Sequence, residues 1–376
     1  MASASGAPGT VVRAMKVGLV LGAGGVQGGA WLTGALDALV RETEWDPMEA
    51  DRIVGTSAGA MIGAIVSAGV PVWFMVAHSA GETIPGLRDA GGRPANEADR
   101  SAGARFACDG LPSWPGSWRL ALATLRDPRR FPPAAVTAGW LPRGFISTEP
   151  LKDTIRRAAG GGWSPHPGLW IVACDYATGR RVVFGRAGSP PATLADAVAA
   201  SCAIPSFYRP VEIDGRFYVD GGMWSTSNLD VIRNEDFDLV ICLNPTSSLH
   251  PTRAWNPIEW LPALARGASG RRLGHEAKKL RAAGTEVVLV QPTGADLRAM
   301  GPNLMSNRRR HATLEMARRT TTAQLREPQV REALAALPKA SRPEKVRRPP
   351  GPPGRWPARA VRDLRPGAPI PAAGTP

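Results

Sequence analysis

The chain has 376 residues, of which 43% are hydrophobic and 21% are charged, so it can bury the core of one large domain or two ordinary ones. The formal net charge is +14, but residues 338–376 hold nine lysines and arginines against two acids. The rest of the chain therefore has only a modest excess of positive charge, and no nucleic acid partner is expected. Four widely spaced cysteines without a CxxC pair argue against a disulfide framework or a zinc site.

The N-terminal region shows no targeting or membrane-spanning pattern. Residues 1–15 have no apolar segment of a secretory signal, so we expect a disordered N-terminus and a cytoplasmic protein. Residues 17–36 and 53–81 lack charges over the length of a membrane span. Seven glycines in the first and Pro71 in the second favour buried strand–turn–helix segments instead.

The first seventy residues contain two strand–glycine turn–helix units. Residues 16–21 and 52–54 are short apolar runs typical of buried strands, and each is followed by glycines. Residues 28–42 then show a helical stripe of apolar side chains, and residues 58–68 form a small-residue helix. This alternation predicts an α/β layered fold with a central, mostly parallel sheet flanked by helices.

Further elements follow at irregular spacing. Turn residues predict two β-hairpins, a helix stopped by a proline, two more buried strands with a basic helical stretch between them, and a final helix. The hairpins are 169–175 with 181–184 and 211–213 with 216–219, the helix is 194–203, the strands are 238–243 and 285–290, and the final helix is 307–325.

Two segments differ in composition from this domain of residues 16–325. Residues 82–145 are rich in Gly, Pro and Arg and are interpreted as a divergent insertion that could act as a lid. Residues 326–376 are predicted to form a short helix and then a disordered, basic, proline-rich tail, since eleven prolines follow position 337 and large apolar residues are scarce.

A GxSxG motif at Gly55-Thr56-Ser57-Ala58-Gly59 lies between a predicted strand and a predicted helix. A serine on such a sharp turn has an exposed hydroxyl, and Gly55 and Gly59 allow the neighbouring chain to pass closely. The N-terminus of the following helix favours negative charge near the serine. Ser57 is therefore the candidate nucleophile of an acyl hydrolase.

A glycine loop at residues 22–28 also joins a strand to a helix, with Gly22 and Gly28 at its ends. Its spacing fits neither GxGxxG nor a Walker phosphate loop. Backbone amides in such a loop can stabilise an oxyanion, which suits a neighbouring nucleophilic serine. Later in the chain, Asp220-Gly221-Gly222 follows a predicted strand, where a carboxylate can accept the proton of a serine hydroxyl.

These three motifs together resemble the patatin-like phospholipase family, and bacterial members share further segments. The further segments are 176–180, 199–205, 210–215 and 301–305. The resemblance covers residues 16–325 apart from most of the insertion and implies a Ser57–Asp220 dyad without histidine, with Gly24 and Gly25 as oxyanion donors. It also implies hydrolysis of lipid esters of the phospholipase A or lysophospholipase type, with no metal or cofactor.

Two positions depart from the family loop, which often reads GGGxxG with a basic residue before the last glycine. Ala23 replaces the first glycine of that triplet, and Gln27 replaces the basic residue. Because backbone donors survive both changes, we expect activity to be retained.

Two alternatives remain. One is an α/β-hydrolase triad, in which His250, His275 or His311 would join Ser57 and an aspartate; it is disfavoured because Ser57 comes after only two predicted strands. The other is a catalytically silent relative that binds lipid or a partner protein in the same pocket.

The insertion also suggests peripheral contact with an anionic membrane. It interleaves Trp114, Trp118, Phe131 and Trp140 with four arginines, a mixture that suits lipid head groups. The alternative is that these aromatic side chains pack on the core while the arginines are solvated.

Overall fold

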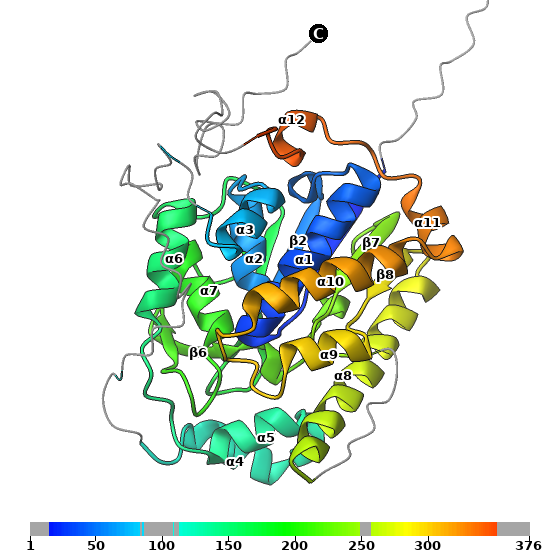
Figure 1. The fold of residues 1–376 in the computed structure, drawn as a ribbon. Coiled ribbons are helices and arrows are strands. Elements are labelled where there is room, and N and C mark those ends of the chain that lie inside the picture. The colour runs from blue at the N-terminus through cyan, green and yellow to red at the C-terminus, as the bar shows by residue number, and fades with distance from the viewer. Residues whose placement is uncertain (1–14, 83–84, 86–107, 109–112, 249–256, 352–376) are drawn as a thin grey trace, which may run out of the picture.

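The computed structural model describes residues 15–82, 85, 108, 113–248 and 257–351, of which residues 257–265 are described by their backbone alone. It has a central eight-stranded sheet with helices on both faces (Figure 1). The strand order is β5-β6-β3-β2-β1-β7-β8, and β4 pairs with β3. The predicted α/β fold with a mostly parallel sheet is confirmed.

Five strands pair in parallel and form the middle of the sheet. They are β1 (Val17–Leu21), β2 (Arg52–Thr56), β3 (Leu169–Asp175), β7 (Leu239–Leu243) and β8 (Glu286–Val290). Three antiparallel strands complete one side: β4 (Arg181–Phe184), β5 (Val211–Ile213) and β6 (Arg216–Asp220). All the predicted strands and both hairpins are present, with bounds shifted by two residues at most.

The two faces of the sheet are covered by different helices because side chains alternate along each strand. Leu19 and Leu21 of β1 pack into the larger core cluster, whereas Val20 packs into the cluster on the other face. The first face is covered by α1 (Gly25–Thr43), α2 (Ala58–Ser67) and α7 (Leu194–Cys202), with α10 (Arg310–Leu325) lying across α1 (Figure 1). The second face is covered by α8 (Pro257–Ala282) and the short turn Leu229–Ile232.

The described residues form seven further helices around this framework. They are α3 (Val72–Ser79), α4 (Trp118–Arg126), α5 (Pro133–Trp140), α6 (Glu149–Ala159), α9 (Gly294–Met300), α11 (Pro328–Leu334) and α12 (Pro343–Val346). None of the helices in the described parts of the chain is long and apolar enough to cross a bilayer. The two long uncharged stretches are therefore strand–turn–helix segments, as predicted.

The insertion contains helices that the sequence pattern did not reveal. In Figure 1, α4 and α5 form the lower edge of the molecule. Leu120 and Ala138 pack with Tyr176, Val219 and other residues in a third core cluster. Phe131 is one of the aromatic side chains for which the sequence suggested contact with a membrane. It packs against this cluster instead, with its ring next to Gly179.

The C-terminal segment differs from the expected tail. Residues 338–351 are not an extended appendage but pack at the upper edge of the molecule, where α12 lies (Figure 1). The amide of Ala340 donates to the Glu44 carbonyl at 2.9 Å, and the indole of Trp73 donates to the Lys345 carbonyl at 2.9 Å. The composition argument was wrong here because these partners lie far away in sequence. Residues 352–376 lie outside the described part.

The close packing of α1 on α10 gives a test of the fold. A Cβ on Gly34 would lie 2.2 Å from the Leu314 carbonyl oxygen of α10, whereas a Cβ on Gly29, in the same helix, would have nothing within 4 Å. Alanine favours a helix over glycine by about 1 kcal/mol. We expect Gly29→Ala to raise the free energy of unfolding by about that amount and Gly34→Ala to lower it by about 1–3 kcal/mol. Urea unfolding measures both, and stabilisation by Gly34→Ala would contradict the packing.

Candidate functional site

Ser57 occupies a strained turn between β2 and α2. Its backbone angles are φ 53° and ψ −117°, a conformation that costs a non-glycine residue about 1–3 kcal/mol. Two glycines make the turn sterically feasible. A Cβ on Gly55 would lie 2.5 Å from the Ala60 Cα, and a Cβ on Gly59 would lie 2.0 Å from the Leu21 carbonyl oxygen. The GxSxG motif is thus required by the close crossing of α2 over the ends of β1 and β2.

The C-terminal end of α7 fixes the backbone of Ser57. The Ser57 amide donates to the Ser201 hydroxyl at 2.9 Å, and that hydroxyl donates to the Val172 carbonyl at 2.6 Å. The Cys202 thiol donates to the Ser57 carbonyl, with 3.2 Å between sulfur and oxygen. The amide of Asp220 donates to the Ala203 carbonyl at 2.9 Å. Three consecutive residues therefore hold both Ser57 and Asp220, a role that no pattern in the sequence assigned to them.

Strand register brings Ser57 beside Asp220. Thr56, the last residue of β2, pairs with Val172 of β3, and Asp220 pairs with the next residue, Ala173. Because β4 occupies the other edge of β3, β2 and β6 share one edge and meet end to end. The residue that follows Thr56 is therefore placed next to the last residue of β6.

Asp220 is a buried carboxyl whose side chain accepts a hydrogen bond from the Gly222 amide at 2.7 Å. The neighbouring Ser57 hydroxyl also favours the ionised form of this carboxyl. Asp220 is only 5% exposed. Burial raises the pKa of Asp220 to about 6, although the Ser57 hydroxyl and the Gly222 amide both act to lower it. A carboxylate with this pKa is ionised at neutral pH and is a stronger base than an exposed aspartate.

Gly221 and Gly222, which follow Asp220, pack closely against neighbouring atoms of the site. A Cβ on Gly221 would lie 2.4 Å from the Val172 carbonyl oxygen, and a Cβ on Gly222 would lie 3.0 Å from an Asp220 carboxylate oxygen. Both positions therefore favour glycine, and Gly222 also supplies the amide that Asp220 accepts.

The glycine loop of residues 22–28 begins α1 and presents backbone amides. The amides of Gly22, Ala23 and Gln27 donate to carbonyls of Leu243, Thr226 and Leu304 at 2.8–2.9 Å. Within the described residues, the amides of Gly24 and Gly25 have no acceptor, as is usual at the start of a helix. These two donors are available to an anion.

Close approaches also explain the glycines of this loop. A Cβ on Gly22 would lie 2.3 Å from the Asn244 side-chain oxygen, and a Cβ on Gly24 would lie 2.6 Å from the Gly28 Cα. Gly25 has φ +61°, a conformation that L side chains rarely adopt.

Gln27 ties this loop to the segment that leads into α10. Its side chain is fully buried, donates to the Ser306 carbonyl at 2.6 Å and accepts from the Thr313 hydroxyl at 2.6 Å. A neutral amide can make both bonds, whereas a lysine could not accept the second. The departure from a basic residue thus has a structural reason and leaves the backbone donors in place.

A buried polar network orders the loop after Asp220. The side-chain amide of Asn228 donates to the Thr56 hydroxyl at 3.1 Å and to the Gly221 carbonyl at 3.2 Å. Glu276 of α8 accepts from the hydroxyls of Ser225 and Ser227 at 2.8 and 2.6 Å. These residues, which the sequence did not single out, connect β2, the Asp220 turn and α8.

His166 is buried, whereas His275 and His311 are exposed to solvent. His166 is held between the Ala50 carbonyl at 2.9 Å and the Gly168 amide at 3.0 Å, and burial lowers its pKa. His275 and His311 are exposed side chains on α8 and α10, whereas Asp220 is buried. His250, the third candidate of the triad hypothesis, lies outside the described residues.

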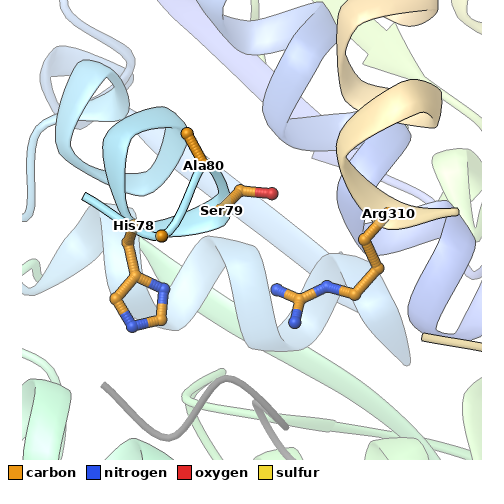
Figure 2. Close-up of a pocket in the computed structure, with 5 residues that line it drawn as sticks. His78, Ser79, Ala80 and Arg310 are labelled. Carbon is orange, nitrogen blue, oxygen red and sulfur yellow. The ribbon is translucent and has the colours of Figure 1, made fainter. Parts of the chain in front are cut away.

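A separate pocket lies between the end of α3 and the start of α10. It has a volume of about 330 Å³ and is lined by His78, Ser79, Ala80, Gly81 and Arg310. Figure 2 shows Ser79 and Arg310 reaching into it from the two facing helices. Neither Ser57 nor Asp220 lines this pocket, so a second serine near a histidine is available as a control for the first.

The chain is similar to several known proteins. The sequence model of the patatin-like phospholipase family matches residues 19–233. Uncharacterised NTE family proteins of Mycobacterium bovis and Mycobacterium tuberculosis are each 28% identical over 262 residues, which are 68% of this chain and 57% of theirs. The chain thus spans just over half the length of these curated relatives. The crystal structure of VipD from Legionella pneumophila covers 83% of this chain and 67% of that one, with a TM-score of 0.39 and 13% identity.

The burial of Asp220 predicts a pH-dependent effect on stability. Its pKa is about 6 in the folded chain against 3.8 for an exposed aspartate, so its ionisation destabilises the fold progressively as pH rises between these values and fully above them. Asp220→Asn removes this charge. We expect it to raise the free energy of unfolding at pH 8 by up to about 3 kcal/mol, and by much less at pH 4. Urea unfolding at both pH values measures the difference, and a gain that is larger at pH 4 would be inconsistent with the raised pKa.

Proposed function

The chain belongs to the patatin-like phospholipase family, and on that premise we propose that it is a serine acyl hydrolase of lipid esters, with Ser57 as nucleophile and Asp220 as general base. Family membership by itself suggests a lipid ester hydrolase. The observation that carries the finer proposal is the strand register that places Ser57, on its strained turn, next to the buried Asp220 carboxyl, whose pKa burial raises to about 6. A binding protein would need neither the strained serine nor the uncompensated buried charge.

In the first step, Asp220 accepts the proton of the Ser57 hydroxyl while Oγ attacks the ester carbonyl carbon. The carbonyl oxygen becomes an oxyanion, which accepts hydrogen bonds from the amides of Gly24 and Gly25. An oxyanion-hole donor typically contributes ~3 kcal/mol to the transition state. The tetrahedral intermediate then expels the alcohol, which takes the proton from Asp220, and the acyl group remains on Ser57.

In the second step, water hydrolyses the acyl-enzyme. Asp220 accepts a proton from the water as its oxygen attacks the acyl carbon, and the same two amides stabilise the second oxyanion. Ser57 leaves with the proton that Asp220 held, and the fatty acid is released. Every proton is carried by Asp220, so this chain's own residues complete the cycle.

For the substrate class we propose the phospholipase A or lysophospholipase type. Such esters reside in membranes, so the proposal includes peripheral contact with a membrane surface. The α4–α5 pair packs beside Val219 and Met223, which flank Asp220, and we propose that the insertion forms one wall of the entrance to the site.

A fluorophosphonate probe tests the nucleophile. The serine oxygen displaces fluoride from phosphorus, so one phosphonyl group should be found by mass spectrometry on the peptide that contains Ser57. We expect Ser57→Ala to abolish labelling and to lower ester hydrolysis by ~10³-fold or more. Ser79→Ala is the matched control, because Ser79 lines the pocket that also holds His78, and labelling should persist. A folded protein that takes up no probe would refute the enzyme assignment and favour a silent, lipid-binding relative.

A further inference from the structure

The described residues leave seven large hydrophobic side chains exposed, and six of them lie on α4, α5 and their flanking turns. These six form what we call the tryptophan–leucine face: Trp114, Trp118, Leu122, Leu125, Trp140 and Leu141. The seventh, Phe217, lies under the Arg143 guanidinium at 4.3 Å from the ring centre, directly beside this region. Exposed apolar groups gathered in this way mark an interaction surface.

The face is a continuous stripe. On α4, Trp118, Leu122 and Leu125 follow each other at intervals of four and three residues, so they share one side of the helix. Leu120 and Thr124, on the other side, are buried. Trp114 packs edge-on against Trp118 with 6.2 Å between ring centres. The two flanking turns are also adjacent, because the amide of Gly116 donates to the Leu141 carbonyl at 2.8 Å.

Positive charge flanks this stripe. Residues 113–143 contain five arginines and a single acid, Asp127. Arg119 and Arg126 lie seven residues apart and hence on one edge of the stripe, and both are exposed. Arg129 and Arg130 follow in the next turn and are exposed as well. Tryptophan rings that border exposed guanidinium groups match the head-group layer of an anionic bilayer, where each group finds its preferred environment.

The face is also close to the candidate site. Leu120 and Ala138 share a core cluster with Val219 and Met223, which lie one residue before and three residues after Asp220. In Figure 1, α4 and α5 lie at the lower edge of the molecule, while α12 lies at the upper edge. A membrane bound at the lower edge would adjoin the side of the sheet on which β6 ends.

We propose that the chain docks on an anionic lipid bilayer through the tryptophan–leucine face, with Arg119, Arg126, Arg129 and Arg130 contacting lipid phosphates. The identity of the partner as a membrane rests on the proposed function, since a lipid esterase must reach a bilayer. The docking itself uses no catalytic residue. A protein partner would instead require a surface complementary to a convex helix edge and would show no dependence on lipid charge.

Vesicle sedimentation tests the docking in a Ser57→Ala background, so that vesicles are not degraded and a failure of catalysis does not affect the result. The full chain should bind vesicles of mixed phosphatidylglycerol and phosphatidylcholine more tightly than vesicles of phosphatidylcholine alone, and salt should weaken the binding. Leu122→Gln with Leu125→Gln should lower affinity about tenfold or more, with an unchanged thermal midpoint because both side chains are exposed.

The charges have a matched control. Arg119→Gln with Arg126→Gln should lower affinity for the anionic vesicles about tenfold. Lys278→Gln with Arg331→Gln removes two exposed cations of α8 and α11 and should leave affinity within twofold. Absence of vesicle binding, equal loss from both charge pairs, or full binding by the leucine variant would each overturn the proposal.

Discussion

A buried carboxyl group is the constraint on which the rest of the site depends. Asp220 is buried at the end of β6, and among the described residues the groups that favour its ionised form are the Ser57 hydroxyl and the Gly222 amide. Burial outweighs both and raises its pKa to about 6. The fold must keep this carboxylate next to Ser57 although its burial is unfavourable. The backbone pairing of the strands, rather than ion pairs, keeps it there.

The backbone pairing depends on β3 and on glycines. One edge of β3 receives the end of β2 and then the end of β6, so the two reactive side chains come from different strands that meet on a shared neighbour. Residues 201–203 at the end of α7 bond to Ser57, which follows β2, and to Asp220, the last residue of β6. Gly55, Gly59 and Gly221 let these segments approach to distances that no Cβ would allow. These contacts keep Ser57 in its strained backbone conformation.

Much of this could be predicted from the sequence because it is encoded locally. Short apolar runs identified the buried parallel strands, turn residues identified the two hairpins, and Gly55–Gly59 identified the serine turn, since all of these signals depend on adjacent residues. The helices α4 and α5 escaped prediction because they are short, with nine and eight residues, and lie in a segment whose abundant Gly, Pro and Arg suggested irregular structure, although Trp118, Leu122 and Leu125 recur at helical spacing. The packing of residues 338–351 and the roles of Ser201, Asn228 and Glu276 also escaped it, since each depends on partners that are distant in the chain.

The pH dependence of kcat/KM for a soluble p-nitrophenyl ester tests the central claim most directly. If Asp220 is the general base, the rate falls about tenfold per pH unit below about 6, and the inflection is the same in His250→Ala, His275→Ala and His311→Ala. Asp220→Asn should lack measurable hydrolysis at every pH. An inflection that disappears in any one of the histidine variants, with activity kept in Asp220→Asn, would contradict the serine–aspartate account.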